Sequence, residues 1–109
     1  MDINFENFSK FNIVVGTIVN AELNVKAIKP AYILNIDFGN KIWIKKTSAQ
    51  ITNYNFTDLL GRQVIAVTNF PTKKIAGTTS EVLVLAAVNS EGAHLLKLDK
   101  HIENGTYVS

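Results

Sequence analysis

Hydrophobic residues recur at every second position over most of this chain, which is the spacing of β-strands. Tyr32, Leu34, Ile36 and Phe38 alternate with Ile33, Asn35 and Asp37, for example. The same pattern, together with enrichment in Val, Ile and Thr, predicts the other strands. The predicted strands cover Ile13–Asn20, Tyr32–Phe38, a return strand through Ile42 and Ile44, Gln63–Phe70, Glu81–Val88 and a weaker sixth at His94–Leu98.

Turn and cap residues divide these strands. Gly39-Asn40 is typical of a hairpin turn, and Gly16 predicts a bend or bulge inside the first strand. A short helix is expected over Thr57–Leu60, with Thr57 as its N-cap and Gly61 ending it. Pro71 ends the fourth strand because it cannot donate to a strand ladder.

The number and order of these elements predict an all-β fold with minor helix. Five strands with a short helix between the third and fourth indicate a five-stranded oligonucleotide-binding (OB) barrel with N- and C-terminal extensions. A β-sandwich fits the pattern nearly as well. The chain has 109 residues and shows no repeat or linker. We therefore expect one domain over residues 1–109, large enough for a single core.

Both ends of the chain carry apolar residues that one barrel does not need. Phe5 and Phe8 are three residues apart, with Asn4 as a possible cap, so they share a face of a helical turn that Phe11 follows. The segment Val82–Val88 is apolar on both faces. Its spare face lies either under the N-terminal turn of the same chain or against a second copy, and we favour a homodimer. The predicted dimer contacts are Phe5, Phe8, Phe11, Val82, Val84, Ala86 and Val88.

Charge is unevenly distributed along the chain. The formal net charge is +2, but residues 24–80 carry +6 whereas residues 1–23 and 81–109 carry −2 each. A segregated positive field of this kind attracts polyanions. The alternative is a solvated charged surface that only maintains solubility.

Several classes of protein are excluded or disfavoured by composition. The chain has no cysteine, which excludes disulfide scaffolds and thiol chemistry and is consistent with a reducing compartment. Its longest apolar run, Val82–Val88, is far shorter than the about 20 residues of a membrane span, and the chain opens without a charged-then-apolar leader. We therefore expect a cytoplasmic protein.

Residues suited to catalysis are scarce. His94 and His101 are the only histidines and have no metal-ligand spacing, and neither a P-loop nor a dinucleotide motif occurs. No base neighbours the hydroxyls of Thr47-Ser48 or residues 78–80. We expect a binding protein with no cofactor and no metal, and a small enzyme acting on phosphorylated substrates is the disfavoured alternative.

The clearest candidate binding surface is the segment from Lys41 to Lys45. If Ile42 and Ile44 face the core, alternation puts Lys41, Trp43 and Lys45 together on the outer face, where the ring can stack on bases and the ammonium groups can meet phosphates. The alternative is that Trp43 is buried under a loop or a partner. Further candidates are the cations Lys46, Lys73 and Lys74 and the neutral donors Ser48, Asn69 and Ser80.

A family resemblance covers nearly the whole chain. The motifs are residues 48–52 (SAQIT), 61–67 (GRQVIAV), 69–71 (NFP), 75–77 (IAG), 80–85 (SEVLVL) and 104–106 (NGT). They resemble the CsaA proteins, which belong to the wider class of tRNA-binding domains. The resemblance implies an OB barrel that dimerises through its terminal extensions. It also implies two activities, tRNA binding and chaperoning of unfolded or pre-export polypeptides.

The resemblance also implies that Lys45, Lys46 and Ser80, which match the family's RNA-facing positions, lie on an RNA-facing surface. Val82-Leu83 replaces the Gly-Met of other tRNA-binding domains, as in CsaA proteins. We therefore predict a CsaA-type tRNA-binding protein with a role in protein export. The alternative is a peptide-binding chaperone with no physiological role in RNA binding.

Overall fold

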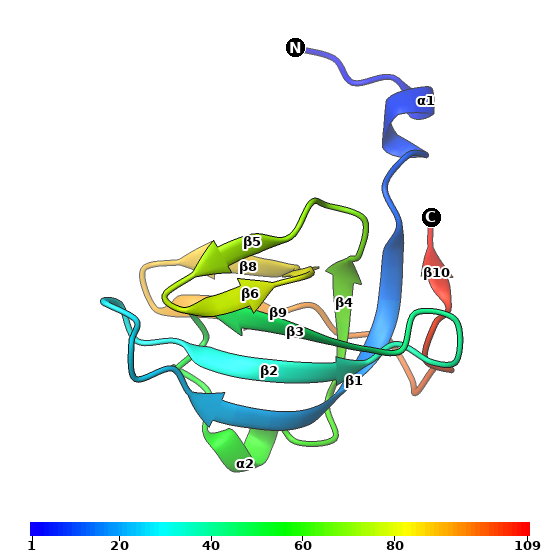
Figure 1. Ribbon diagram of the computed structural model, residues 1–109. Helices are drawn as coiled ribbons and strands as arrows, with labels where there is room; N and C mark the ends of the chain where they lie inside the picture. The colour runs from blue at the N-terminus through cyan, green and yellow to red at the C-terminus, as the bar shows by residue number, and fades with distance from the viewer.

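The long strand β1 (Ile13–Leu23) is at the centre of the fold in a computed structural model that describes residues 1–109. One edge of β1 pairs with β2 (Tyr32–Asp37) and β10 (Tyr107–Val108), and the other pairs with β4 (Gln63–Val67). With β3 (Ile44–Ala49) and β7 (Leu83–Val84) the antiparallel order is β3-β2-β1-β4-β7. Figure 1 shows the strands curling around a common interior.

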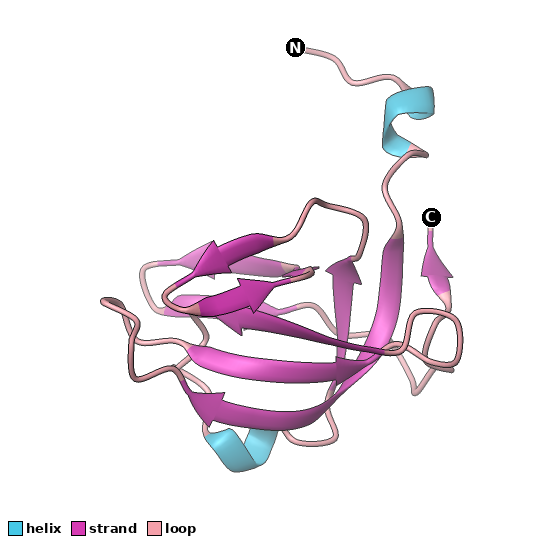
Figure 2. Cartoon of the chain, viewed as in Figure 1, coloured by secondary structure: helices cyan, strands magenta, loops and turns pink.

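Two hairpins and two short helices complete the chain. The first hairpin is β5 (Lys73–Ile75) with β6 (Thr78–Ser80), and the second is β8 (Ala86–Asn89) with β9 (Gly92–Leu95). The helices α1 (Phe5–Phe8) and α2 (Phe56–Leu59) lie at opposite ends of the molecule (Figure 2). Neither is long or apolar enough to span a bilayer.

The β5–β6 hairpin lies against the free edge of β3 and nearly closes the barrel. The amide of Ser48 donates to Ser80 Oγ at 2.9 Å, and the amide of Glu81 donates to the carbonyl of Lys46 at 2.8 Å. The predicted five-stranded OB-type barrel is therefore confirmed, and the sandwich alternative is wrong.

The barrel interior is filled by alternate residues of its strands. Ile18, Leu34 and Ile36 of the strands are fully buried, together with Phe38 directly after β2 and Leu59 of α2. Phe38 packs so closely on β1 that a Cβ on Gly16 would lie 2.6 Å from its ring. Gly16 is thus required by close packing, and the predicted bulge lies instead between Ile18 and Asn20, where the β1–β2 register shifts.

Several predicted elements have different boundaries. Helix α2 begins at Phe56, with Asn55 rather than Thr57 in the N-cap position and no side-chain cap bond. It ends at Leu59, just before the predicted stop at Gly61, which has a φ of +80°. The predicted strand over 81–88 is two strands. β7 pairs with β4 and β8 pairs with β9, so the chain leaves the main sheet at Leu85.

Candidate nucleic-acid interface

The β5–β6 hairpin brings together lysines that are far apart in the sequence. Lys73 pairs with Ser80, and Lys74 with Thr79, next to the segment of β3 that contains Lys45 and Lys46. The hydrogen bonds from β3 to Ser80 and Glu81 fix this arrangement. Four cations from two separate segments therefore gather at one edge of the barrel.

Lys26 adds a fifth cation that the sequence analysis missed as a site residue. The β1–β2 loop carries it across the β5–β6 turn, where a Cβ on Gly77 would lie 3.0 Å from Lys26 Cδ. Asn24 is buried and holds this loop in place by donating to Ser48 Oγ at 3.4 Å. Lys26 and Gly77 are far apart in the sequence, and the β1–β2 loop must fold back for them to meet, so the sequence pattern does not show this contact. We call Lys26, Lys45, Lys46, Lys73 and Lys74 the basic edge.

One member of the basic edge has a carboxylate partner. Lys45 Nζ lies 3.7 Å from Glu81 Oε2, and the other oxygen of Glu81 accepts the backbone N–H of Lys46 at 3.1 Å. The Lys45–Glu81 contact is the only ion pair in the structure. Lys45 is therefore the one lysine of the basic edge whose charge is partly offset by a neighbouring carboxylate.

The predicted shared face of Lys41, Trp43 and Lys45 is wrong. β3 begins only at Ile44, and Trp43 has a left-handed backbone with φ +69° in the β2–β3 turn, which breaks the alternation. Ile44 is exposed rather than in the core, and Lys45 shares the face of buried Thr47. Lys41 and Trp43 are nevertheless both exposed, Trp43 to 68%, so the alternative of a Trp43 buried within the chain is also wrong.

The three predicted neutral donors have structural roles. Ser80 is buried and its hydroxyl accepts the amide of Ser48, so both serines join β3 to β6. Asn69 accepts the amide of Asn12 at 2.9 Å and donates to the carbonyl of Lys10 at 2.8 Å. Because these groups bind backbone, Ser80 and Asn69 are poorly placed for direct contact with a phosphate or a base.

The apolar residues predicted at a dimer interface divide into two groups. Val82 is 6% exposed and belongs to the core, so its prediction as an interface residue is wrong, and Val84 and Ala86 pack against the same core. Val88 is 77% exposed. Next to it, an apolar groove of about 450 Å³ runs between β3, β7, β8 and β9, with Ile75, Leu83 and Leu85 in its lining.

The N-terminal turn does not cover that groove. Helix α1 forms as predicted, with Asn4 accepting the amide of Asn7 at 2.8 Å, but it buries no residue and extends away from the barrel (Figure 1). Phe8 and Phe11 lie 6.4 Å apart, and Phe11 packs edge-on against Phe70 at 5.9 Å. The alternative that the N-terminal turn covers the segment 82–88 is therefore wrong. The aromatic side chains of residues 1–12, which we call the arm, remain exposed.

This combination of a small OB-type barrel and a lysine-rich edge is typical of proteins that bind nucleic acids by shape and charge. Residues 13–107 match the model of the family described as "Putative tRNA binding domain", and the chain belongs to this family.

Solved structures of CsaA chaperone proteins are similar over the full length. The protein from Picrophilus torridus has 46% sequence identity and a TM-score of 0.95, covering 99% of this chain and 100% of that one. The protein from Bacillus anthracis has 44% identity and a TM-score of 0.93, with full coverage of both chains. The predicted resemblance to CsaA is thereby confirmed.

A second group of relatives consists of much longer enzymes. A methionine–tRNA ligase from Thermococcus onnurineus is 33% identical over 107 residues, which is 97% of this chain but only 14% of the ligase. The chain therefore spans about 14% of the length of that relative, and similar shares of the other ligases that it matches.

Proposed function

We propose that this protein binds tRNA through the basic edge, as a homodimer. The observation that carries the proposal is the meeting of β3 with the β5–β6 hairpin, which unites lysines from positions 45–46 and 73–74. Membership of the tRNA-binding domain family supports the same ligand. Each phosphate that a lysine neutralises releases condensed counterions, so the affinity falls steeply with salt.

Within the proposal, Trp43 in the β2–β3 turn is a further contact for RNA, because it directly precedes β3 and is exposed. Its exposed ring offers a stacking platform worth roughly 1 to 3 kcal/mol per base. Trp43 is the only tryptophan of the chain, so its fluorescence reports on the turn alone. We expect binding without a chemical step, because the lysines supply charge but no acid–base pair.

The proposed dimer depends on the arm. A helix of four residues has no stability of its own, so α1 needs a surface to pack on. Within the proposal, the arm of each copy packs on the exposed apolar residues of β7 and β8 in the other, in an isologous contact. Such a dimer presents two basic edges to one folded RNA and fits a protein that acts in the cytoplasm, where tRNA is found.

Titration of tRNA into the protein at two salt concentrations tests the proposal, with Trp43 fluorescence and sedimentation as readouts. We expect saturable binding at low micromolar protein, weaker at high salt, and one tRNA per dimer. A single-stranded RNA of equal length is the control for shape and should bind more weakly. Absence of saturable, salt-sensitive binding would contradict the proposal.

A second candidate function is supported by the apolar groove between β3 and β7–β9. Exposed Leu83 and Val88 beside an open groove of about 450 Å³ offer a surface for an extended polypeptide. The CsaA relatives are described as chaperones, so we propose binding of unfolded or pre-export polypeptides as the alternative role. Suppression of aggregation of a denatured client tests it, and competition by tRNA would show that both ligands use one surface.

A further inference from the structure

A polar pocket of about 330 Å³ lies beside α2, far from the β5–β6 hairpin. Its walls are the α2–β4 turn and the segment 97–101, and Leu98 is its only hydrophobic lining residue. The charged or titratable side chains that line it are Asp58, Arg62, Lys97, Asp99, Lys100 and His101. None of them belongs to the basic edge.

The two walls are fixed to each other by Gln63. Its side-chain oxygen accepts the amide of Ile102 at 3.0 Å, and its side-chain nitrogen donates to the carbonyl of Ile102 and to Asn104 Oδ1. Two backbone hydrogen bonds hold the turn that carries Arg62 to β1. The amide of Gly61 donates to the carbonyl of Ile18, and the amide of Ile18 donates to the carbonyl of Arg62, both at 2.9 Å. The pocket is therefore built from anchored backbone.

Arg62 lies over an aromatic ring that is itself anchored. The guanidinium carbon is 5.0 Å from the ring centroid of Tyr54, whose hydroxyl accepts the amide of Leu95 at 2.9 Å. Stacking on the ring orients the guanidinium but uses none of its N–H donors. No side-chain hydrogen bond from Arg62 to the protein occurs, and its fork of donors is free.

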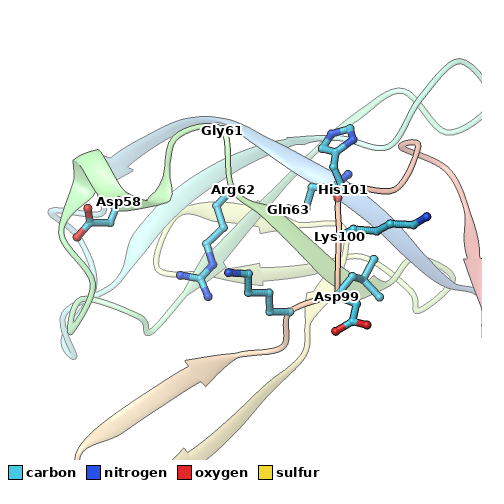
Figure 3. Close-up of a pocket in the computed structure, with 9 residues that line it drawn as sticks. Asp58, Gly61, Arg62, Gln63, Asp99, Lys100 and His101 are labelled. Carbon is cyan, nitrogen blue, oxygen red and sulfur yellow. The ribbon is translucent and has the colours of Figure 1, made fainter.

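The cations of the pocket have no counter-charge within contact distance. Because the only ion pair of the chain is between Lys45 and Glu81, the carboxylates of Asp58 and Asp99 lie beyond 4 Å from Arg62, Lys97 and Lys100. Figure 3 shows Asp58 on its helix, pointing away from Arg62, and Asp99 in the middle of the facing segment, on the far side of the pocket from Asp58. Lys100 also points away from Arg62 in that view, so the cations that line the pocket beside Asp58 and Asp99 are Arg62 and Lys97, and neither is paired with a carboxylate.

We infer that this pocket binds the phosphate group of a small phosphorylated molecule, with Arg62 and Lys97 as its donors. The planar fork of a guanidinium matches two phosphate oxygens, and a neighbouring ammonium adds a charge-assisted hydrogen bond. The carboxylates of Asp58 and Asp99 repel further phosphates of a polyanion, so a single phosphate group fits better than a nucleic-acid strand. Phosphate binding at this pocket is independent of tRNA binding.

Titration of the ¹⁵N-labelled full chain with inorganic phosphate and, separately, with AMP tests the inference. Ionic strength is held constant with sodium chloride. We expect saturable shifts of the amides of Gly61, Arg62 and residues 97–101 with either ligand. Tighter binding of AMP would identify a nucleotide, and equal binding would identify the free anion. Shifts that stay linear, or that chloride reproduces, would overturn the inference.

Two variants separate a binding site from a structural effect. Arg62→Met and Lys97→Met should each weaken phosphate binding about tenfold, because each removes a charged donor. Arg62→Met also loses the contact with Tyr54, which could disturb the fold. Lys97 is exposed, so Lys97→Met tests the pocket without that complication. Lys74→Met is the control and should leave phosphate affinity unchanged. Unchanged affinity in both pocket variants would overturn the inference.

The same variants distinguish this pocket from the proposed RNA surface. Arg62→Met should leave tRNA affinity within about twofold, because loss of one distant charge has only a screened effect. An equal loss of tRNA and phosphate affinity would assign Arg62 to the RNA surface and overturn the separate site. Failure of tRNA binding in the wild-type chain, with phosphate binding retained, would contradict only the proposed function.

Discussion

The barrel and the N-terminal arm use their apolar residues in opposite ways. Ile18, Leu34 and Phe38 are fully buried within the barrel, and no buried side-chain polar atom lacks a hydrogen-bond partner. The arm buries none of its helix residues, and Phe5 is 83% exposed. Apolar burial is the main favourable contribution to folding. The barrel therefore accounts for its own stability, whereas the arm has apolar surface that a second molecule would have to cover.

The largest expected effect distinguishes the two regions by stability. Phe38→Ala should lower the free energy of unfolding by about 3 to 5 kcal/mol, because it leaves a cavity against Gly16 and the barrel interior. Phe5→Ala is the matched control and should change the stability of the isolated monomer by less than about 0.5 kcal/mol. Urea unfolding at low protein concentration measures both. If both variants lose a similar free energy of unfolding, the barrel and the arm do not differ in their contribution to stability.

Shortening the arm tests the other half of the comparison. Deleting residues 1–8 should weaken self-association by at least about 30-fold, since an aromatic anchor at an interface contributes about 2 kcal/mol or more. The barrel should keep its unfolding midpoint when measured as a monomer. Sedimentation equilibrium gives the association constant. A truncated chain that remains fully dimeric would show that the arm does not hold the copies together.

A smaller effect is expected from single lysines of the barrel. Lys74→Met should weaken tRNA binding and lower the slope of log affinity against log salt by about one, because one phosphate contact is lost. Lys10→Met removes the same charge from the arm and is the matched control, with an expected slope equal to that of the wild type. If the slope of log affinity against log salt is the same in both variants, the basic edge is not the RNA-binding surface.

The smallest effect sharpens the role of Lys45. Glu81→Gln keeps an oxygen for the amide of Lys46 but frees Lys45 from its carboxylate partner. We expect tRNA affinity to rise about two- to fivefold, because an ion pair near the surface contributes about 1 kcal/mol or less. Glu91→Gln, in the β8–β9 turn, removes the same charge away from the lysines and should have little effect. Weaker binding in Glu81→Gln would show that the carboxylate positions Lys45 rather than competing for it.

Much of the fold was predictable because β-strands carry a local signal. The alternation of Tyr32–Phe38 gave β2 almost to the residue, and Asn4 with Phe5 and Phe8 gave α1. The β5–β6 hairpin was not predicted, because Lys73–Ile75 and Thr78–Ser80 are three residues each and too short for a pattern of period two. The split of the strand over 81–88 was also missed, since a change of partner at Leu85 leaves no trace in hydrophobicity.

The sequence predicted most of the lysines of the candidate site, but it did not predict how the residues of the site are arranged. Lys45, Lys46, Lys73 and Lys74 were found from the excess of cations in the middle of the chain. Trp43 was placed on the outer face of a strand but lies in the β2–β3 turn, because alternation cannot reveal a residue with positive φ. Ser80 and Asn69 could have been recognised as structural only from their backbone partners, which lie 32 and 57 residues away.

By itself the sequence determined the class of fold, the family and the sign of the charge in each part of the chain, because these depend on composition and on spacing between near neighbours. Only the tertiary structure decided which lysines share an edge, that Val82 is core while Val88 is exposed, and that Arg62 faces the segment 97–101. Those outcomes depend on contacts between residues distant in the chain, which are set by how the strands pair and where the barrel closes.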